Sequence, residues 1–220
     1  NDYLNYKYAR DLFPLVVITN NQRAARGRGK KKWVSLNQNS LSFSLCLRVD
    51  TNNLDLRYLS YLSCVCLYES INTVSEDYLK IKWPNDLYRE NKKVSGILIE
   101  SLSINKEVHL TIGVGININI PNSYSIDQPY SNLSENIDCE KLIYSFCKNI
   151  VENIETKNKS KVIEQFNNNL YGYKKQVEIN NHENIFRGKL YGINDNGELI
   201  IKNDKKTIFI DDINSTMRLL

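Results

Sequence analysis

The feature that most constrains the fold is a pair of β-rich runs separated by only four residues. Residues 94–102, VSGILIESL, and residues 107–120, EVHLTIGVGININI, are rich in β-branched side chains and flank the short segment SINK. Two such runs with a short polar connection predict a hairpin in an antiparallel sheet. The rest of the chain has to extend this sheet or cover it.

Three further segments read as strands. Residues 15–19, LVVIT, form a continuous apolar run that predicts a buried strand. Residues 34–50 alternate between apolar and polar side chains, which predicts a half-buried strand. Residues 79–83 predict a short strand that Pro84 ends. The apolar face of the second of these strands would carry Phe43, Leu45, Leu47 and Val49.

Three segments read as helices. Residues 54–74 carry apolar side chains with a helical period, and their charged residues favour a core helix over a membrane span. Residues 139–157 and 161–170 predict two more helices. Residues 121–135 are rich in Ser, Asn and Pro and predict a loop.

The predicted secondary structure changes near Tyr171. Beyond it, four short β-rich runs follow one another at roughly ten-residue spacing, and Asn196-Gly197 is a turn signal. We therefore expect an α+β protein in two parts. Residues 1–170 would form a catalytic domain with a mixed or antiparallel sheet and helices, and residues 171–220 a small SH3-like β-barrel.

The amino-acid composition argues against several classes of function. The 220 residues carry 29 Lys and Arg against 25 Asp and Glu, a net charge of +4, and a protein that coats nucleic acid is usually more basic. Five scattered Cys without a CxxC, together with only two His, argue against a zinc site and favour free thiols in a reducing cytoplasm. The polar, aromatic first residues do not predict a signal peptide.

The basic excess is concentrated in residues 23–33, RAARGRGKKKW, which we call the basic loop. Six cations and no acid lie in residues 23–32. Gly27 and Gly29 alternate with Arg26 and Arg28, and glycine lets a backbone approach a ligand that the planar fork of arginine suits. From the residues alone, three readings stay open: a solvated charge run, a nucleic-acid patch, or a loop that wraps a phosphate.

A second group of residues favours a phosphate site. KWPNDLY, residues 82–88, ends a strand with Lys82 and enters a turn at Pro84-Asn85-Asp86, and KVSGILIE follows at residues 93–100. GVGININ, residues 113–119, brings small side chains to the same sheet, where a ligand can approach. Taken singly, Lys82 is a surface lysine and Pro84-Asn85-Asp86 an ordinary turn.

Taken together, QRAARGRGKKKW, KWPNDLY with KVSGILIE, and GVGININ resemble biotin–protein ligases over nearly the whole chain. The C-terminal segment FRGKLYGINDNGELIIKND also looks like the small SH3-like domain of that family. The resemblance implies a class II synthetase-like catalytic domain. It further implies that biotin and ATP, with Mg²⁺, give biotinyl-5′-adenylate, and that the biotin then passes to one lysine of a biotin carboxyl carrier protein, a subunit of acetyl-CoA carboxylase.

The resemblance also implies the site residues. Lys82 and Arg28 would be catalytic, Trp33 would lie near the adenine, and the basic loop would close over the ligand. Metal ligands from the protein are not implied. The biotin- and adenylate-binding residues would be Asn1, Gln22, Arg26, Gly27, Arg28, Trp33, Lys82, Gly96, Gly113, Gly115 and Asn117.

The chain departs from the family pattern at two places. Ala25 stands where members usually carry a glycine, so the loop is differently shaped if that position needs a positive φ. Asn1 matches the last residue of a Ser-Thr-Asn biotin motif whose Ser-Thr the sequence does not contain, so we expect that the sequence begins inside the motif. The general base for the second step is not identified, and Asp86 is near it only in sequence.

Two rival functions remain at this stage. A lipoate–protein ligase shares the catalytic fold, and a non-catalytic module could hold nucleic acid with its basic loop. We expect a ligase without an N-terminal winged-helix domain, which would make DNA binding unlikely, and nothing predicts a membrane partner. A homodimer stays open.

Overall fold

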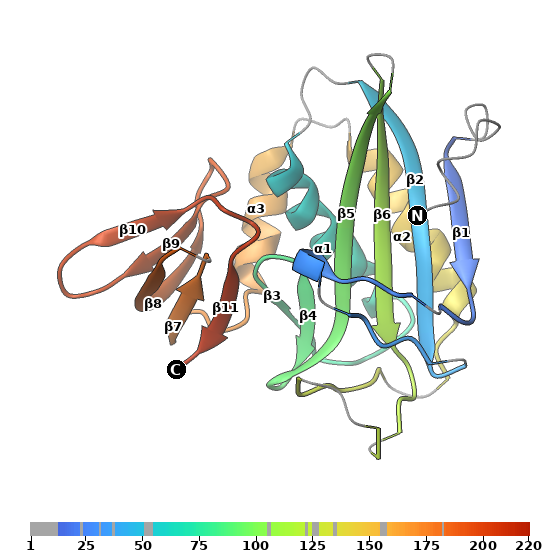
Figure 1. Cartoon of the computed structure of the whole chain (residues 1–220), viewed down its shortest axis with the longest axis horizontal. Helices are drawn as coiled ribbons and strands as arrows, with labels where there is room; N and C mark the ends of the chain where they lie inside the picture. Colours follow the sequence, from blue (N-terminus) through green and yellow to red (C-terminus); the bar gives the residue numbers. More distant parts are fainter. Residues whose placement is uncertain are drawn as a thin grey trace.

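The computed structural model describes residues 13–22, 24–30, 32–36, 38–50, 55–104, 107–121, 123–124, 128–133, 136–154, 158–181 and 183–220. Its strands lie in two sheets, and its α-helices pack on the larger of them (Figure 1). The α+β class expected from the sequence is therefore confirmed.

The larger sheet has six strands in the order β1-β2-β6-β5-β4-β3, and every neighbouring pair is antiparallel. The predicted hairpin, β5–β6, forms its centre. The strands are β1 (Leu15–Thr19), β2 (Ser40–Asp50), β3 (Lys80–Lys82), β4 (Asp86–Arg89), β5 (Lys92–Ile104) and β6 (Glu107–Asn117).

The helices α1 (Leu56–Asn72), α2 (Cys139–Ile154) and α3 (Lys159–Asn168) agree with the three predicted helices to within a few residues. The Asp55 carboxylate caps α1 by accepting hydrogen bonds from the backbone N–H groups of Arg57 and Tyr58. The core lies between these helices and one face of the six-stranded sheet, where Phe43 of β2 meets Phe146 of α2 edge to face at 5.5 Å between ring centroids.

The smaller sheet has the strand order β10-β9-β8-β7-β11. Four of its strands were predicted, and the fifth, β11, was not. Because β10 and β11 are its two edges and are not paired with each other in the described residues, the β-sheet unit is confirmed and its closure into a barrel stays a prediction. The strands are β7 (Gln176–Asn180), β8 (Ile185–Ile193), β9 (Leu199–Lys202), β10 (Thr207–Ile210) and β11 (Thr216–Leu219).

The turn that follows β3 is shorter than the turn predicted from the sequence. Asp86 is not the end of a turn, because it begins β4 and pairs with Lys82 on one side and Gly96 on the other. A four-residue strand between a Pro-Asn turn and another turn carries too little periodicity to be read from sequence. Within the described residues, none of the helices is long and apolar enough to span a bilayer.

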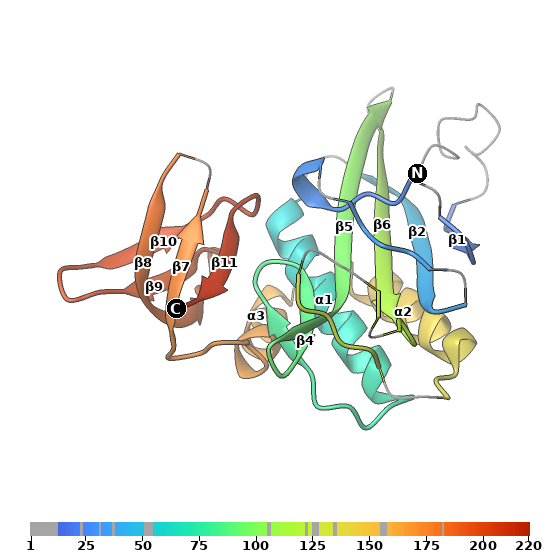
Figure 2. The same ribbon diagram turned by 60° about the horizontal axis from the view of Figure 1, so that its bottom comes forward.

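Backbone and side-chain hydrogen bonds tie the two sheets together. Ile81 of β3 donates to the Asn169 carbonyl and accepts from the Tyr171 N–H, both at 2.8 Å. The Tyr61 hydroxyl of α1 accepts from Trp83 Nε1 at 3.2 Å and donates to the Gly197 carbonyl at 2.8 Å. These bonds connect the part of the chain that holds the smaller sheet to β3 and α1, and Figure 2 shows the smaller sheet beside α3.

Candidate functional site

The site begins with a row of residues that crosses five strands. The pairing registers place Lys82 opposite Asp86, Asp86 opposite Gly96, Gly96 opposite Gly115, and Gly115 opposite Ser42. Residues directly opposite one another share a face of a sheet. The neighbouring row, which contains Phe43, faces the helices. Because successive side chains of a strand point to opposite faces, the row from Lys82 to Ser42 faces away from the helices.

Two glycines at the centre of the row make room for neighbouring side chains, and Gly115 makes room for an aromatic ring. A Cβ added to Gly115 would lie 2.5 to 2.7 Å from three atoms of the Trp33 indole, so the ring rests directly on the backbone of β6. A Cβ on Gly96 would come within 3.0 Å of the Lys93 side chain and 3.3 Å of Asp86. Gly113, by contrast, has nothing closer than 3.5 Å, which is ordinary contact.

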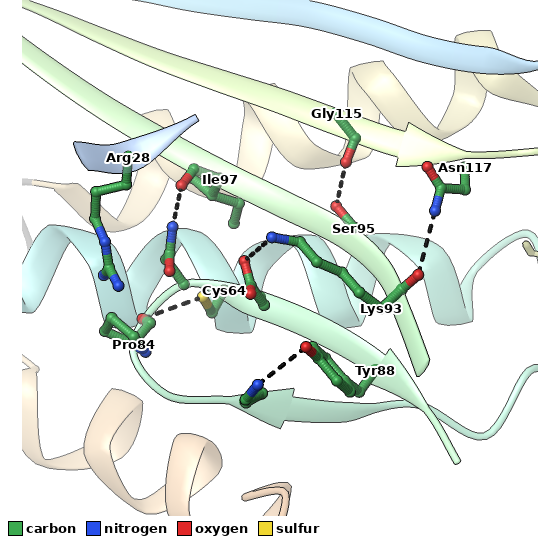
Figure 3. Close-up of polar contacts among 12 residues, drawn as sticks. Arg28, Cys64, Pro84, Tyr88, Lys93, Ser95, Ile97, Gly115 and Asn117 are labelled. Atoms are coloured by element: carbon green, nitrogen blue, oxygen red, sulfur yellow. Dashed lines mark hydrogen bonds and ion pairs between the residues drawn. The ribbon is translucent and has the colours of Figure 1, made fainter. Parts of the chain in front are cut away.

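Charged side chains lie near the row, and Figure 3 shows Arg28 and Lys93 together with Gly115. Lys93 Nζ lies 2.6 Å from Asp86 Oδ1 and 5.6 Å from the centroid of the Trp33 ring. Lys82 Nζ donates to the Tyr88 hydroxyl at 3.0 Å. Burial, followed by the charge of Asp86, raises the pKa of Tyr88 well above its usual range. Tyr88 is therefore a neutral acceptor, and the positive charge of Lys82 is not cancelled by it.

Hydrogen bonds to α1 and to β5 hold the turn between Lys82 and Asp86 in place. The Pro84 carbonyl accepts from the Ser60 hydroxyl of α1 at 3.0 Å and from the Cys64 thiol at 3.7 Å. The Asn85 side chain donates to the Ile97 carbonyl of β5 at 2.6 Å. Lys82 consequently projects from a fixed strand end, a geometry that suits a group that must meet a reacting atom.

The basic loop folds into a compact hairpin over this face. Arg26 and Lys32 form an antiparallel bridge, and the Trp33 N–H donates to the Ala25 carbonyl at 3.1 Å. A 3-10 turn at Arg28–Lys30 reverses the chain, with Gly29 at φ 62° and ψ 37°, a conformation that glycine adopts without strain. Ala25 is not among the described non-glycine residues with positive φ, so the departure from the family glycine imposes no strain there.

The two arginines of the loop have different partners. The Arg26 side chain is 58% exposed, and its Nη2 lies 3.5 Å from Glu100 Oε1 of β5. Arg28 donates from Nη1 to the Ile213 carbonyl and from Nη2 to the Ser215 carbonyl, the latter over 2.7 Å. Burial lowers the pKa of Arg28, whereas the nearby carboxylates of Asp86 and Asp212 raise it. Its guanidinium stays protonated, as arginine does in proteins.

The structure brings five of the residues implied by the resemblance to one face of the sheet: Lys82, Gly96, Gly115, Trp33 and Arg28. Gly113 lies on the same face, two positions from Gly115 along β6. Gln22 is exposed beyond the end of β1, and Gly27 is partly buried in the basic loop. Asn1 lies outside the described residues.

Asn117 lies two positions from Gly115 along β6, on the same face, and its side chain binds backbone groups of the protein. Its Nδ2 donates to the Lys93 and Ser131 carbonyls, both at 3.2 Å, and its own carbonyl accepts from the Leu133 N–H. Only 3% of the residue is exposed. In this structure Asn117 holds the segment that follows Pro129 against β5 and β6, and both hydrogens of its amide are used for that purpose.

Three residues of the site were not assigned from the sequence: Asp86, Tyr88 and Lys93. All three lie in the quoted segments KWPNDLY and KVSGILIE. What places these side chains beside Lys82 and Trp33 is the strand register, including a shift between Leu87 and Tyr88. Among the described residues, no three His, Cys, Asp or Glu side chains gather into a group that could hold a metal ion.

This arrangement is chemically suited to an anion with an attached ring. Lys82 on a fixed strand and Arg28 on a loop lie near Asp86, which is next to Gly96 and Gly115 in the row; we call these two glycines the glycine floor, and the Trp33 ring lies on Gly115. Fixed cations and donors of this kind stabilise charge that develops on phosphate oxygens.

Known proteins resemble this chain in sequence and in fold. The model of the biotin/lipoate A/B protein ligase family matches residues 5–117. The chain resembles the structure of a biotin protein ligase from Aquifex aeolicus in complex with biotin and ATP, with a TM-score of 0.81 over 93% of this chain and 89% of that one at 24% identity. A synthetase from Helicobacter pylori with bound biotinylated ATP gives a TM-score of 0.67 over 94% and 93% at 19% identity. These two likenesses show the fold.

Curated relatives match part of the chain. The bifunctional ligase/repressor BirA of Bacillus spizizenii is 35% identical over 105 residues, which are 47% of this chain and 32% of the relative. The biotin–[acetyl-CoA-carboxylase] ligase of Paracoccus denitrificans is 32% identical over 105 residues, which are 46% of this chain and 43% of the relative. The matched part therefore spans less than half the length of these relatives.

Proposed function

Because the chain belongs to the biotin/lipoate A/B protein ligase family, we propose that it is an ATP-dependent biotin–protein ligase. The observation that carries the proposal is the glycine floor of Gly96 and Gly115, with Trp33 on it and the cations Lys82 and Arg28 at its margins. Relatives named as biotin ligases, from Paracoccus denitrificans and Schizosaccharomyces pombe, support biotin over the alternatives.

In the first proposed step, a carboxylate oxygen of biotin attacks the α-phosphorus of ATP. The bond between that phosphorus and the bridging oxygen breaks, and pyrophosphate leaves, so that biotinyl-5′-adenylate remains. Lys82 would meet the carboxylate and the α-phosphate from the strand end, and Arg28 would meet the phosphate from the loop. Both act as fixed charges that stabilise the transition state, and no protein nucleophile is needed. Mg²⁺ would enter with ATP as part of the substrate, held mainly by phosphate oxygens.

In the second step, the amine of a carrier lysine attacks the activated carbonyl carbon. The bond from that carbon to the AMP oxygen breaks, AMP leaves, and the amine gives up a proton as the amide forms. The Lys82 ammonium and the Arg28 guanidinium stabilise the leaving phosphate. Trp33 provides a flat apolar surface next to Gly115 on which the adenine ring can stack. The site that Asn1 belongs to by resemblance would hold biotin itself.

The acceptor in this proposal is a biotin carboxyl carrier protein of the acetyl-CoA carboxylase type. The name of the Paracoccus relative, which is 32% identical, supports that choice. We further propose that residues 1–170 and 171–220 are separate domains, because the first strand of the smaller sheet, β7, begins at Gln176. Five free cysteines suit a reducing compartment, so we place the protein in the cytoplasm.

The test is biotin-dependent exchange of labelled pyrophosphate into ATP, which reports only the first step. Lys82→Ala should abolish the exchange, because it removes the cation from the strand end. Lys80→Ala is the matched control, since Lys80 is on the same strand and its Nζ lies 3.5 Å from the Asn168 carbonyl and 5.1 Å from the centroid of the Tyr78 ring. Exchange that follows lipoate instead of biotin would move the chain to the other branch of its family. Full exchange in Lys82→Ala would refute the role of Lys82.

A further inference from the structure

The proposed function does not use the contact between the basic loop and the C-terminal part of the chain. Arg28 donates from Nη1 to the carbonyl of Ile213, 185 residues further along the chain. Its Nη2 donates to the carbonyl of Ser215 over 2.7 Å. Both acceptors lie between β10 and β11, in residues 212–215, which we call the carbonyl turn.

Asp212 shapes the carbonyl turn. Its Oδ1 accepts from the Asn214 N–H at 2.8 Å, and its Oδ2 accepts from the Ser215 hydroxyl at 3.2 Å. Its backbone carbonyl accepts from the Ser215 N–H at 3.0 Å. An aspartate that binds its own backbone two residues on closes a tight turn. Ser215 is completely buried, so the turn is held in one shape from both ends.

The choice of acceptor matters for a ligand-binding arginine. A carboxylate partner would orient the guanidinium but would also offset its charge, whereas two neutral carbonyls orient it and leave the charge available. Arginine has five N–H donors in a fixed fork, so two of them can be used for orientation while others face a ligand. Asp212 is also close enough to act on Arg28 through its charge, and it favours the protonated guanidinium.

We propose that the carbonyl turn is a positioning element for Arg28, with Asp212 as the positioning residue, and that it holds the basic loop over the glycine floor. The consequence for catalysis rests on the proposed function, whereas the effect on the loop does not. The smaller sheet would then complete the site by orienting a group of the larger one. Its own side chains would not need to touch the reacting atoms.

The first test is limited trypsin digestion, because the basic loop offers trypsin several Lys and Arg bonds. When opening is fast, cleavage follows the population of the open loop. Asp212→Ala removes the two side-chain acceptors of the turn, and we expect cleavage within residues 26–32 to accelerate roughly tenfold. Asp212→Asn keeps an oxygen for the Asn214 N–H and should restore protection. Asp211→Ala is the matched control, because Asp211 is adjacent, acidic and exposed.

A double-mutant cycle separates this role from general damage to the smaller sheet. Arg28→Gln removes the guanidinium but leaves the turn intact, and cleavage at the remaining bonds of the loop should accelerate as in Asp212→Ala. Adding Asp212→Ala to Arg28→Gln should then change nothing further, because the turn acts through Arg28. Thermal unfolding of each variant identifies any that fails to fold, in which case the comparison between Arg28→Gln and the unaltered chain still tests the contact.

Three results would overturn the inference. The loop is not held by the turn if Asp212→Ala is cleaved no faster than Asp211→Ala. The charge, and not the shape of the turn, holds Arg28 if Asp212→Asn behaves like Asp212→Ala. The turn acts independently of Arg28 if the double variant is cleaved faster than either single one. The proposed function fails separately, if the unaltered chain gives no biotin-dependent exchange while these cleavage rates still differ as expected. Where exchange is present, Asp212→Ala should lower its rate roughly tenfold and Asp212→Asn should restore it.

Discussion

The contact between Trp33 and Gly115 gives the sharpest prediction. In Gly115→Ala, the new Cβ would lie 2.5 Å from Trp33 Cε2 and 2.7 Å from Cζ2 and Nε1, whereas an ordinary contact begins at 3.4 Å. The backbone of β6 has no positive φ at this position and accepts alanine. The indole therefore has to move by roughly 1 Å, and it carries the end of the basic loop with it.

The magnitude follows from the cost of overpacking, which is about 1 to 3 kcal/mol for an added methyl group in a filled space. Because Trp33 lies on a loop over the sheet and not in the core, most of this free energy should appear in ligand binding. We expect biotin-dependent pyrophosphate exchange to fall about 5- to 150-fold. The thermal midpoint of unfolding should change little.

Gly113→Ala is the matched control, since it adds the same methyl group to the same strand and face. Its Cβ would meet nothing closer than 3.5 Å, so exchange should stay near that of the unaltered chain. In Trp33→Ala the clash partner is gone, and adding Gly115→Ala should then have little effect. Equal loss of exchange in Gly113→Ala and Gly115→Ala would refute the reasoning, because the effect would then not depend on the indole.

Two further predictions concern stability, beside those already given for Lys82 and Asp212. Asn117→Ala should lower the free energy of unfolding by about 2 to 4 kcal/mol in urea titration, because two partly buried carbonyls lose their donor. An unchanged midpoint would mean that water replaces the amide. The Arg187 and Arg218 partners of buried Glu178 lower the pKa of its carboxyl below the ordinary value of 4.5. The ionised Glu178 carboxylate therefore contributes fully to stability above pH 4.5, and this contribution is lost as the pH falls through the lower pKa of the folded state. Glu178→Gln should flatten this acidic part of the curve of unfolding free energy against pH. An unchanged curve would contradict the role given to Glu178.

Local pattern predicted much of the fold. The strand at residues 15–19 has the predicted bounds, and the β5–β6 hairpin is present because runs of β-branched residues with a short connection have few alternatives. β4 and β11 were missed. Each has four residues, and segments this short have too few positions for alternation to stand out.

Local pattern could not predict the assembly of the site. The row from Lys82 to Ser42 depends on the registers of five strands, and no single segment contains that information. The contact of Arg28 with residues 213 and 215 depends on the packing of the smaller sheet beside β3. Asn117 was assigned to the ligand because it lies in GVGININ, and only the structure shows that its amide binds two backbone carbonyls.

The central claim is that this face of the sheet activates biotin as an acyl-adenylate. The most direct measurement is mass spectrometry of the small molecules that stay bound to the chain after incubation with biotin, ATP and Mg²⁺. The account predicts biotinyl-5′-adenylate on the unaltered chain and on Lys80→Ala, and none on Lys82→Ala. An absence of the adenylate from the unaltered chain, or an adenylate formed from lipoate but not from biotin, would contradict it.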